Sequence, residues 1–166
     1  KAAVRAAIEY HGPVYLRFSR FATPVFHNED YSFKIGKGYK LKEGTDLTIV
    51  GTGLTVYQSL LAAEELEKDG ISIRVLNYPT IKPLDKELIC QAAKETGRIV
   101  TIEEHSIIGG LGSAVCEAVC ECCPIPVNRI GVEDVFGSSG SAGDLLKHFG
   151  FTSDGIVQKI RQILSK

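Results

Sequence analysis

From Thr45 onward, short apolar runs alternate with longer segments whose apolar residues recur at helical spacing. Residues 47–50 form a nearly continuous apolar run, as expected for a strand buried on both faces. The expected strands span residues 33–41, 47–50, 71–77, 98–102 and 127–132. Because parallel strands need helical crossovers, the sequence predicts an α/β fold, a three-layer α/β/α domain around a mostly parallel five-stranded sheet. Residues 33–41 are expected at its edge, since Lys34, Lys37 and Lys40 would protect an edge strand.

Capping residues predict where the helices of this domain begin. A side chain that accepts a hydrogen bond from a free N–H group of the first turn favours a helix start. The expected caps are the pairs Thr55 with Gln58 and Ser141 with Asp144, followed by Asp85 and by Thr152 or Ser153.

Residues 1–32 follow a different pattern. Ala2–Glu9 is expected to be a helix ended by Gly12-Pro13, and residues 14–19 are strand-like. One helix and one strand cannot form a core, and a chain that begins with Lys1 inside a helix looks cut from a longer one. Residues 1–21 are therefore expected to be the last part of a preceding domain. Residues 22–32 lack periodicity and predict a linker, in which His27 is expected to be solvated rather than catalytic.

Charge and hydropathy exclude several kinds of partner. The chain has 19 Lys and Arg against 20 Asp and Glu, without the basic patch that is typical of nucleic-acid binding. No apolar segment approaches the length that spans a membrane, and the start of the chain has no signal-peptide pattern. We therefore expect a globular protein of the cytoplasm, with neither nucleic acid nor a membrane as partner.

Four of the five cysteines crowd into one helical segment, which raises the question of a metal site. Cys116 and Cys120 share a helix face, but Cys122 and Cys123 are adjacent and no C-x-x-C pair is present. Zinc and free thiols are the alternatives; the spacing favours free thiols, and no metal ligands are expected. Cys90 is expected on a helix near the core. A domain of this size needs no disulfides, which indicates a reducing compartment.

The residues most suited to chemistry lie between the fourth expected strand and the helix after it: Glu103, Glu104, His105, Gly109, Gly110 and Gly112. Ligands and partner surfaces usually lie at the carboxyl ends of parallel strands. Two carboxylates beside a histidine suit either acid/base chemistry or a polar cluster at a domain or subunit interface. The glycines suit either an anion site made of backbone N–H groups or close packing of the helix, and packing is favoured. Ser113 is the expected cap of the helix.

Two further features bear on phosphate recognition. Gly51-Thr52-Gly53 follows a strand and opens a helix, but Val56 stands where a dinucleotide fingerprint needs its third glycine. No acidic residue ends the next strand, so a tight structural turn is the better interpretation. Arg17 and Arg20 lie in the strand-like segment near the N-terminus. A fixed arginine there suits either bidentate phosphate recognition or an ion pair at a domain junction.

Taken in order, several motifs resemble the C-terminal section of transketolases over essentially the whole chain: GPVYLRFSR, DLTIVGTG, IKPLD, EEHSIIGGLGSAV and VFGSSGSAGDLLKHFGFT. The form encoded as a separate C-terminal subunit in some bacteria and archaea is the most similar. The resemblance implies a C-terminal domain over residues 33–166 and a linker over residues 22–32. Residues 1–21 would be the closing helix and strand of the aminopyrimidine-binding domain.

The resemblance also implies a function for the complete enzyme rather than for this chain alone. Transketolases work as dimers in the pentose phosphate pathway and transfer a two-carbon ketol unit from a ketose phosphate to an aldose phosphate. Thiamine diphosphate and Mg²⁺ would be held by upstream domains or by an N-terminal subunit. This chain is thus expected to hold no cofactor, to supply no catalytic residue and to be inactive alone. Arg20 matches the family arginine that contacts the sugar phosphate, and residues 103–112 would lie at the junction with the rest of the enzyme.

Related thiamine enzymes share parts of this pattern. The C-terminal part of deoxyxylulose phosphate synthase, or of a 2-oxoacid dehydrogenase β subunit, is therefore an alternative. A stand-alone module would be an alternative of a different class. If it binds anions at the glycine-rich turn, it should bind them without any partner polypeptide. If it only dimerises, it should form a stable dimer without affinity for small molecules.

Overall fold

The computed structural model describes residues 1–19, 22–27 and 31–165. Its helices are α1 (Ala2–Glu9), α2 (Thr55–Lys68), α3 (Lys86–Thr96), α4 (Leu111–Cys122), α5 (Ala142–His148) and α6 (Ser153–Leu164). Its strands are β1 (Tyr39–Lys42), β2 (Leu47–Gly51), β3 (Ile73–Asn77), β4 (Ile99–Ser106) and β5 (Val127–Val132).

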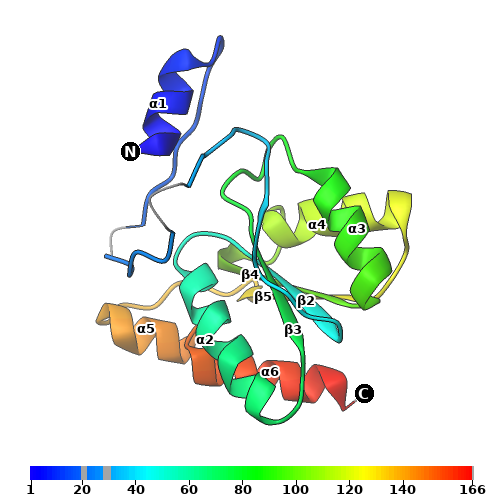
Figure 1. Ribbon diagram of the computed structural model, residues 1–166. Helices are drawn as coiled ribbons and strands as arrows, with labels where there is room; N and C mark the ends of the chain where they lie inside the picture. Colours follow the sequence, from blue (N-terminus) through cyan, green and yellow to red (C-terminus); the bar gives the residue numbers. More distant parts are fainter. Residues whose placement is uncertain (20–21, 28–30, 166) are drawn as a thin grey trace.

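The five strands form one sheet in the order β1-β3-β2-β4-β5. The strands β2 to β5 pair in parallel, and β1 runs antiparallel to β3 at one edge. Helices α3 and α4 cover one face of the sheet, α2 and α6 cover the other, and α1 lies apart from these layers (Figure 1). The predicted three-layer α/β/α fold with a mostly parallel five-stranded sheet is confirmed.

Each face of the sheet has its own apolar core, because successive strand residues point to opposite sides. In β4, Ile102 belongs to the cluster that includes residues of α2 and α6, whereas Ile99 belongs to the cluster that includes residues of α3 and α4. Both side chains are fully buried, which contributes about 1.5–3 kcal/mol for each residue of this size. The sheet and the helices on its two faces thus form the packed core. The connections that follow β2 and β4 lie at the carboxyl edge of this core.

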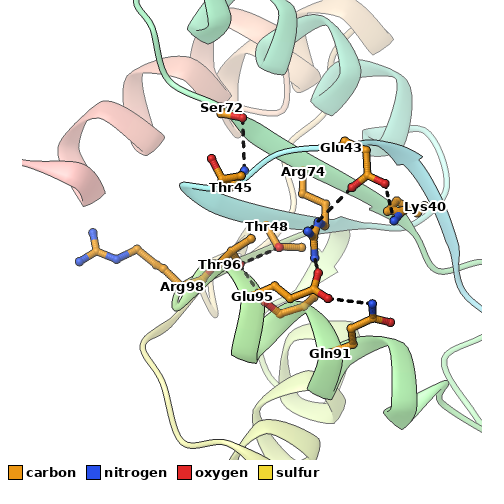
Figure 2. A network of polar contacts seen from close by, with 11 residues as sticks. Lys40, Glu43, Thr45, Thr48, Ser72, Arg74, Gln91, Glu95, Thr96 and Arg98 are labelled. Carbon is orange, nitrogen blue, oxygen red and sulfur yellow. Dashed lines mark hydrogen bonds and ion pairs between the residues drawn. The ribbon is translucent and has the colours of Figure 1, made fainter.

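A polar network joins the amino end of β3 to α3 (Figure 2). The guanidinium of Arg74, a residue only 8% exposed, binds the Glu95 carboxylate at 2.5 Å and lies 3.8 Å from that of Glu43. Glu95 also accepts a hydrogen bond from Gln91, and the hydrogen bonds from Gln91 and Arg74 lower the pKa of Glu95. Because the network lies at the amino end of the parallel strands, away from the usual ligand side of such sheets, we interpret it as structural.

The N-terminal segment differs from its prediction. Ala2–Glu9 is helical as expected, but residues 14–19 form no strand. Among the described residues, no strand pairs with residues 14–19. Their backbone groups therefore have no neighbouring strand with which to form hydrogen bonds. The edge strand β1 begins at Tyr39 instead of residue 33, because the chain first turns at Gly36, whose φ is +81°.

The predicted helix caps are confirmed at α3, α5 and α6 but not at α2. Asp85, Ser141 and Thr152 each accept a hydrogen bond from an N–H group of the helix that they precede. The predicted capping box at α2 is wrong. The Thr55 hydroxyl lies within hydrogen-bonding distance of the carbonyl oxygens of Thr52 and Ile102, since this side chain is buried against β4. The side-chain oxygen of Gln58 instead accepts the N–H of Ser153.

The cysteines also differ from their prediction. Cys90 of α3 and Cys122 of α4 form a disulfide, so the expectation that all these cysteines are free thiols is wrong. The two cysteines are 32 residues apart in the sequence, and the packing of α3 against α4 brings them together. Cys116, Cys120 and Cys123 are free, and burial raises the pKa of the Cys116 thiol. The disulfide removes the argument from cysteine usage for a reducing compartment.

His27 is not the solvated residue that its linker position predicts. Its ring stacks on that of Tyr31, with centroids 3.7 Å apart, and its Nε2 lies 3.2 Å from the side-chain nitrogen of Asn77. Partial burial lowers the pKa of His27. These contacts hold the end of the linker against the carboxyl end of β3.

Candidate functional site

Strand β4 runs to Ser106, beyond its predicted end at residue 102, and carries Glu103, Glu104 and His105. It continues because β5 extends beside it, with Ser106 opposite Val132. The two glutamates serve opposite faces of the sheet: Glu103 contacts α4, and Glu104 lines a pocket beside α5. The sequence, in which one glutamate was expected to end the strand and the other to face the loop, therefore placed these residues correctly at a carboxyl end but predicted too short a strand.

The extended part of β4 is a bulge. Between Ile102 and Ser106 the register shifts, so that β4 takes four steps where β5 takes two. Bulges free backbone groups from the ladder and often lie next to functional sites. Gly131 of β5 permits the close approach, since a Cβ there would lie 2.8 Å from the carbonyl oxygen of His105. A glycine inside a predicted strand is the one sequence signal for this bulge.

Glu103 caps helix α4 from the neighbouring strand. Its carboxylate is 2% exposed and accepts the N–H groups of Leu111 and Gly112, each at 2.7 Å. Charge-assisted bonds at the positive end of a helix compensate the burial of the carboxylate. The prediction that Ser113 caps the helix is wrong: Ser113 lies inside α4, and its hydroxyl accepts the N–H of Gly109.

The glycines of the turn make room for this cap. A Cβ on Gly110 would lie 2.0 Å from Oε2 of Glu103, and a Cβ on Gly112 would lie 2.8 Å from the Thr101 hydroxyl. Gly109 has a φ of +74°, which side-chain-bearing residues rarely adopt. The geometry therefore supports the close-packing interpretation of these glycines.

The same cap argues against an anion site at this turn. An external anion would need the N–H groups at the start of α4, and Glu103 already occupies those of Leu111 and Gly112. It would also lie beside a buried carboxylate, which repels it. The Glu103 carboxylate thus takes the place that an external anion would need at this turn.

Glu104 contacts the N-terminal segment. Nη2 of Arg17 donates a hydrogen bond to the backbone carbonyl of Glu104 at 3.0 Å. The half-buried Glu104 side chain lines a pocket of about 130 Å³ with, among others, Phe149 and Phe151. Burial raises the pKa of the Glu104 carboxyl, and the charge of Arg17 offsets part of that rise. The sequence placed Arg17 at a junction as one alternative but gave no sign of its acceptor.

The hydrogen-bonding partner of His105 is a backbone carbonyl and not Glu103. Its Nδ1 lies 2.9 Å from the carbonyl oxygen of Ser106 and 4.0 Å from Oε2 of Glu103, whose two oxygens already accept backbone N–H groups. Arg20, the predicted phosphate contact, lies outside the residues that the structure describes.

The turn after β2 is structural. Gly53 has a φ of +63°, and the backbone N–H of Thr52 donates to the carbonyl oxygen of Ile102. Over the described ranges, no group of three or more His, Cys, Asp or Glu side chains could hold a metal ion. Nor does any helix in the part of the chain that is described have the length and apolar character needed to cross a bilayer.

Residues 36–156, which include the whole sheet and the capped turn, match the family described as transketolase, C-terminal domain. The chain belongs to this family. The transketolase C-terminal domain is thereby identified from the turn before β1 as far as the first turn of α6.

Individual relatives are similar to this chain over all or nearly all of its length. A 6-deoxy-6-sulfo-D-fructose transketolase subunit of Clostridium sp. is 42% identical over 166 residues, 100% of this chain and 52% of the relative. A 1-deoxy-D-xylulose-5-phosphate synthase of Heliobacterium modesticaldum is 41% identical over 164 residues, 96% of this chain and 25% of the relative. A solved structure described as a split gene transketolase, inactive beta4 tetramer, has a TM-score of 0.94 at 45% identity. It matches 99% of this chain and 54% of its own. The chain thus spans about half the length of the transketolase subunits that it matches.

Proposed function

We propose that this chain is the C-terminal part of a transketolase that transfers a two-carbon ketol unit from a ketose phosphate to an aldose phosphate. The observation that carries the proposal is the family match over residues 36–156, supported by transketolase subunits that align with this chain from end to end. The activity belongs to the complete enzyme, and the chain alone is inactive.

Thiamine diphosphate and a divalent metal such as Mg²⁺ are held by other domains in this proposal. The described residues do not fit either group. The helix start that could receive a diphosphate is occupied by Glu103, and the described side chains offer no cluster of metal ligands. The partner is therefore the polypeptide that carries the diphosphate- and aminopyrimidine-binding domains, whether it is upstream sequence or an N-terminal subunit. A second copy of the enzyme completes a dimer.

The parts of the chain have separate roles in the proposal. Residues 1–21 close the aminopyrimidine-binding domain, residues 22–32 link the domains, and residues 33–166 form the C-terminal domain. Arg20 contacts the substrate phosphate. The capped turn after β4, with Glu103, Glu104, His105, Gly109, Gly110 and Gly112, faces the junction with the rest of the enzyme, in the cytoplasm. The contact of Arg17 with Glu104 supports this placement, because it joins the N-terminal segment to that turn.

A panel of donor substrates tests the proposal against its alternatives. The reconstituted enzyme, with thiamine diphosphate and Mg²⁺, is assayed with D-xylulose 5-phosphate and with pyruvate, in each case with an aldose phosphate acceptor. We expect turnover of xylulose 5-phosphate. Turnover of pyruvate but not of xylulose 5-phosphate, with the aldose phosphate as acceptor, would replace the proposal with deoxyxylulose phosphate synthase. Turnover of pyruvate only after an electron acceptor is added would replace it with a 2-oxoacid dehydrogenase. Calorimetric titration of the chain alone with inorganic phosphate should give no binding, whereas a stand-alone anion-binding module would bind it.

A further inference from the structure

A pocket lies beside the bulge of β4. Its volume is about 130 Å³, and it is bounded by β4, the end of β5, helix α5 and the residues that follow α5. The apolar part of its lining consists of Val132, Ala142, Leu145, Leu146, Phe149 and Phe151. Because an apolar cavity of about 150 Å³ binds benzene, this pocket has room for a group of about five non-hydrogen atoms.

Glu104 is the charged residue of this pocket, and among the described residues that line it no other carries a charge. Nη2 of Arg17 donates to the backbone carbonyl of Glu104, but no donor in the described part of the chain binds the carboxylate oxygens. A half-buried carboxylate without a hydrogen-bond donor is destabilised in its ionised form, and burial accordingly raises the pKa of Glu104. A ligand that donates a hydrogen bond to this carboxylate would relieve the cost.

The pocket therefore favours one class of ligand. A carboxylate accepts hydrogen bonds and attracts positive charge, so a cation with N–H groups matches it, whereas an anion is repelled. The apolar walls suit an alkyl chain, and aromatic rings add to the attraction of a cation. An ammonium group carries three donors on a compact head, whereas a guanidinium group is planar and larger.

We infer that this pocket binds the ammonium group of a primary alkylamine with a chain of about four carbons. The chain packs against Phe149 and Phe151, whose ring centroids are 6.1 Å apart, and the ammonium group donates to the carboxylate of Glu104. A free amine and the side chain of a lysine on another polypeptide share this chemistry. The inference goes beyond the proposed function, since it involves neither the sugar phosphates nor the cofactor.

The test on this chain uses n-butylammonium as the probe and n-butanol as its uncharged counterpart, at about pH 7, followed by the NMR signals of the phenylalanine rings. The ammonium should bind about tenfold more tightly, because a hydrogen bond to a charged group adds to the burial of the same chain. Glu104→Gln should weaken binding of n-butylammonium about tenfold and change that of n-butanol by less than about twofold. Glu117→Gln, at an exposed glutamate of α4, is the control and should change neither.

A second variant tests the location of the probe independently of charge. Ala142→Leu fills the pocket while it leaves Glu104 in place, so it should abolish binding of n-butylammonium. Unchanged binding by this variant would overturn the inference. Equal affinity for the two probes, or equal affinity of wild type and Glu104→Gln for n-butylammonium, would also overturn it.

The reconstituted enzyme separates the two sources of the ammonium group. If n-butylammonium still binds after assembly with the polypeptide that carries the cofactor domains, the pocket belongs to a free amine. If assembly blocks the probe and Glu104→Gln weakens assembly about tenfold, a lysine of that polypeptide is the occupant. If assembly blocks the probe and the variant assembles as tightly as wild type, the pocket is only covered and the inference is wrong. None of these results depends on turnover of xylulose 5-phosphate, so a failure of the proposed function is recognised separately.

Discussion

The carboxylate of Glu103 occupies the space into which a side chain at Gly110 would project. A Cβ on Gly110 would lie 2.0 Å from Oε2 of Glu103. The cap of α4 comes from a strand, and the turn that leads to the helix has no room for a side chain at this point. The stability of the turn therefore depends on both residues together.

Gly110→Ala should lower the free energy of unfolding by about 2 kcal/mol, because the added methyl group forces the buried carboxylate away from its two donors. Urea unfolding measures the change. Gly137→Ala is the matched control, since a Cβ at Gly137 meets no atom within 4 Å. Equal stabilities of the two variants would contradict the packing described for the turn.

Glu103→Ala should lower the free energy of unfolding by about 2–4 kcal/mol, because it leaves the N–H groups of Leu111 and Gly112 without their acceptor. Glu117→Ala, at an exposed glutamate of the same helix, is the control. In the Glu103→Ala background, Gly110→Ala should cost less than it does alone, since the clashing carboxylate is gone. Strict additivity would show that the two residues do not compete for space.

Reduction should destabilise the domain through the Cys90–Cys122 bond. Cutting a disulfide that closes a loop of this length costs about 2–4 kcal/mol, so a reductant or Cys90→Ser should lower the melting temperature. Cys120→Ser, which removes a free thiol, should melt like the wild type. Alkylation before reduction should modify Cys116, Cys120 and Cys123 only. Modification of all five cysteines would show that the disulfide does not form.

The Glu104 carboxyl should make stability depend on pH. Burial raises its pKa, so the folded state holds this proton more tightly than the unfolded state does. Its ionisation therefore reduces stability as the pH rises from the ordinary glutamate pKa through the raised one. Glu104→Gln should raise the melting temperature at about pH 7 and have little effect at about pH 3.5. The same change at both values would contradict this assignment.

Much of the fold follows from local patterns in the sequence. The strand β5 has its predicted bounds, and Asp85 caps α3 as expected, because alternation and capping depend on neighbouring residues. The strand predicted for residues 14–19 failed because a strand needs a partner, and local propensity cannot supply one.

The errors at the site have a common physical cause. Ser113 has the right chemistry to cap α4, but Glu103 reaches the same N–H groups from a strand. Cys90 and Cys122 meet only because α3 packs on α4. Each of these contacts joins elements that are separate in the sequence. The spacing of residues along the chain therefore does not predict it. Even so, Glu103 and the glycines of the turn, which the sequence singled out, do pack together at the start of α4.

Ketol transfer from xylulose 5-phosphate to ribose 5-phosphate, with thiamine diphosphate and Mg²⁺, tests the central claim most directly. Three samples are compared: this chain, the polypeptide with the diphosphate- and aminopyrimidine-binding domains, and the two together. We predict turnover only in the mixture, because this chain supplies the C-terminal domain and other domains hold the cofactor. Turnover by this chain alone, or full turnover by the other polypeptide without it, would contradict the account.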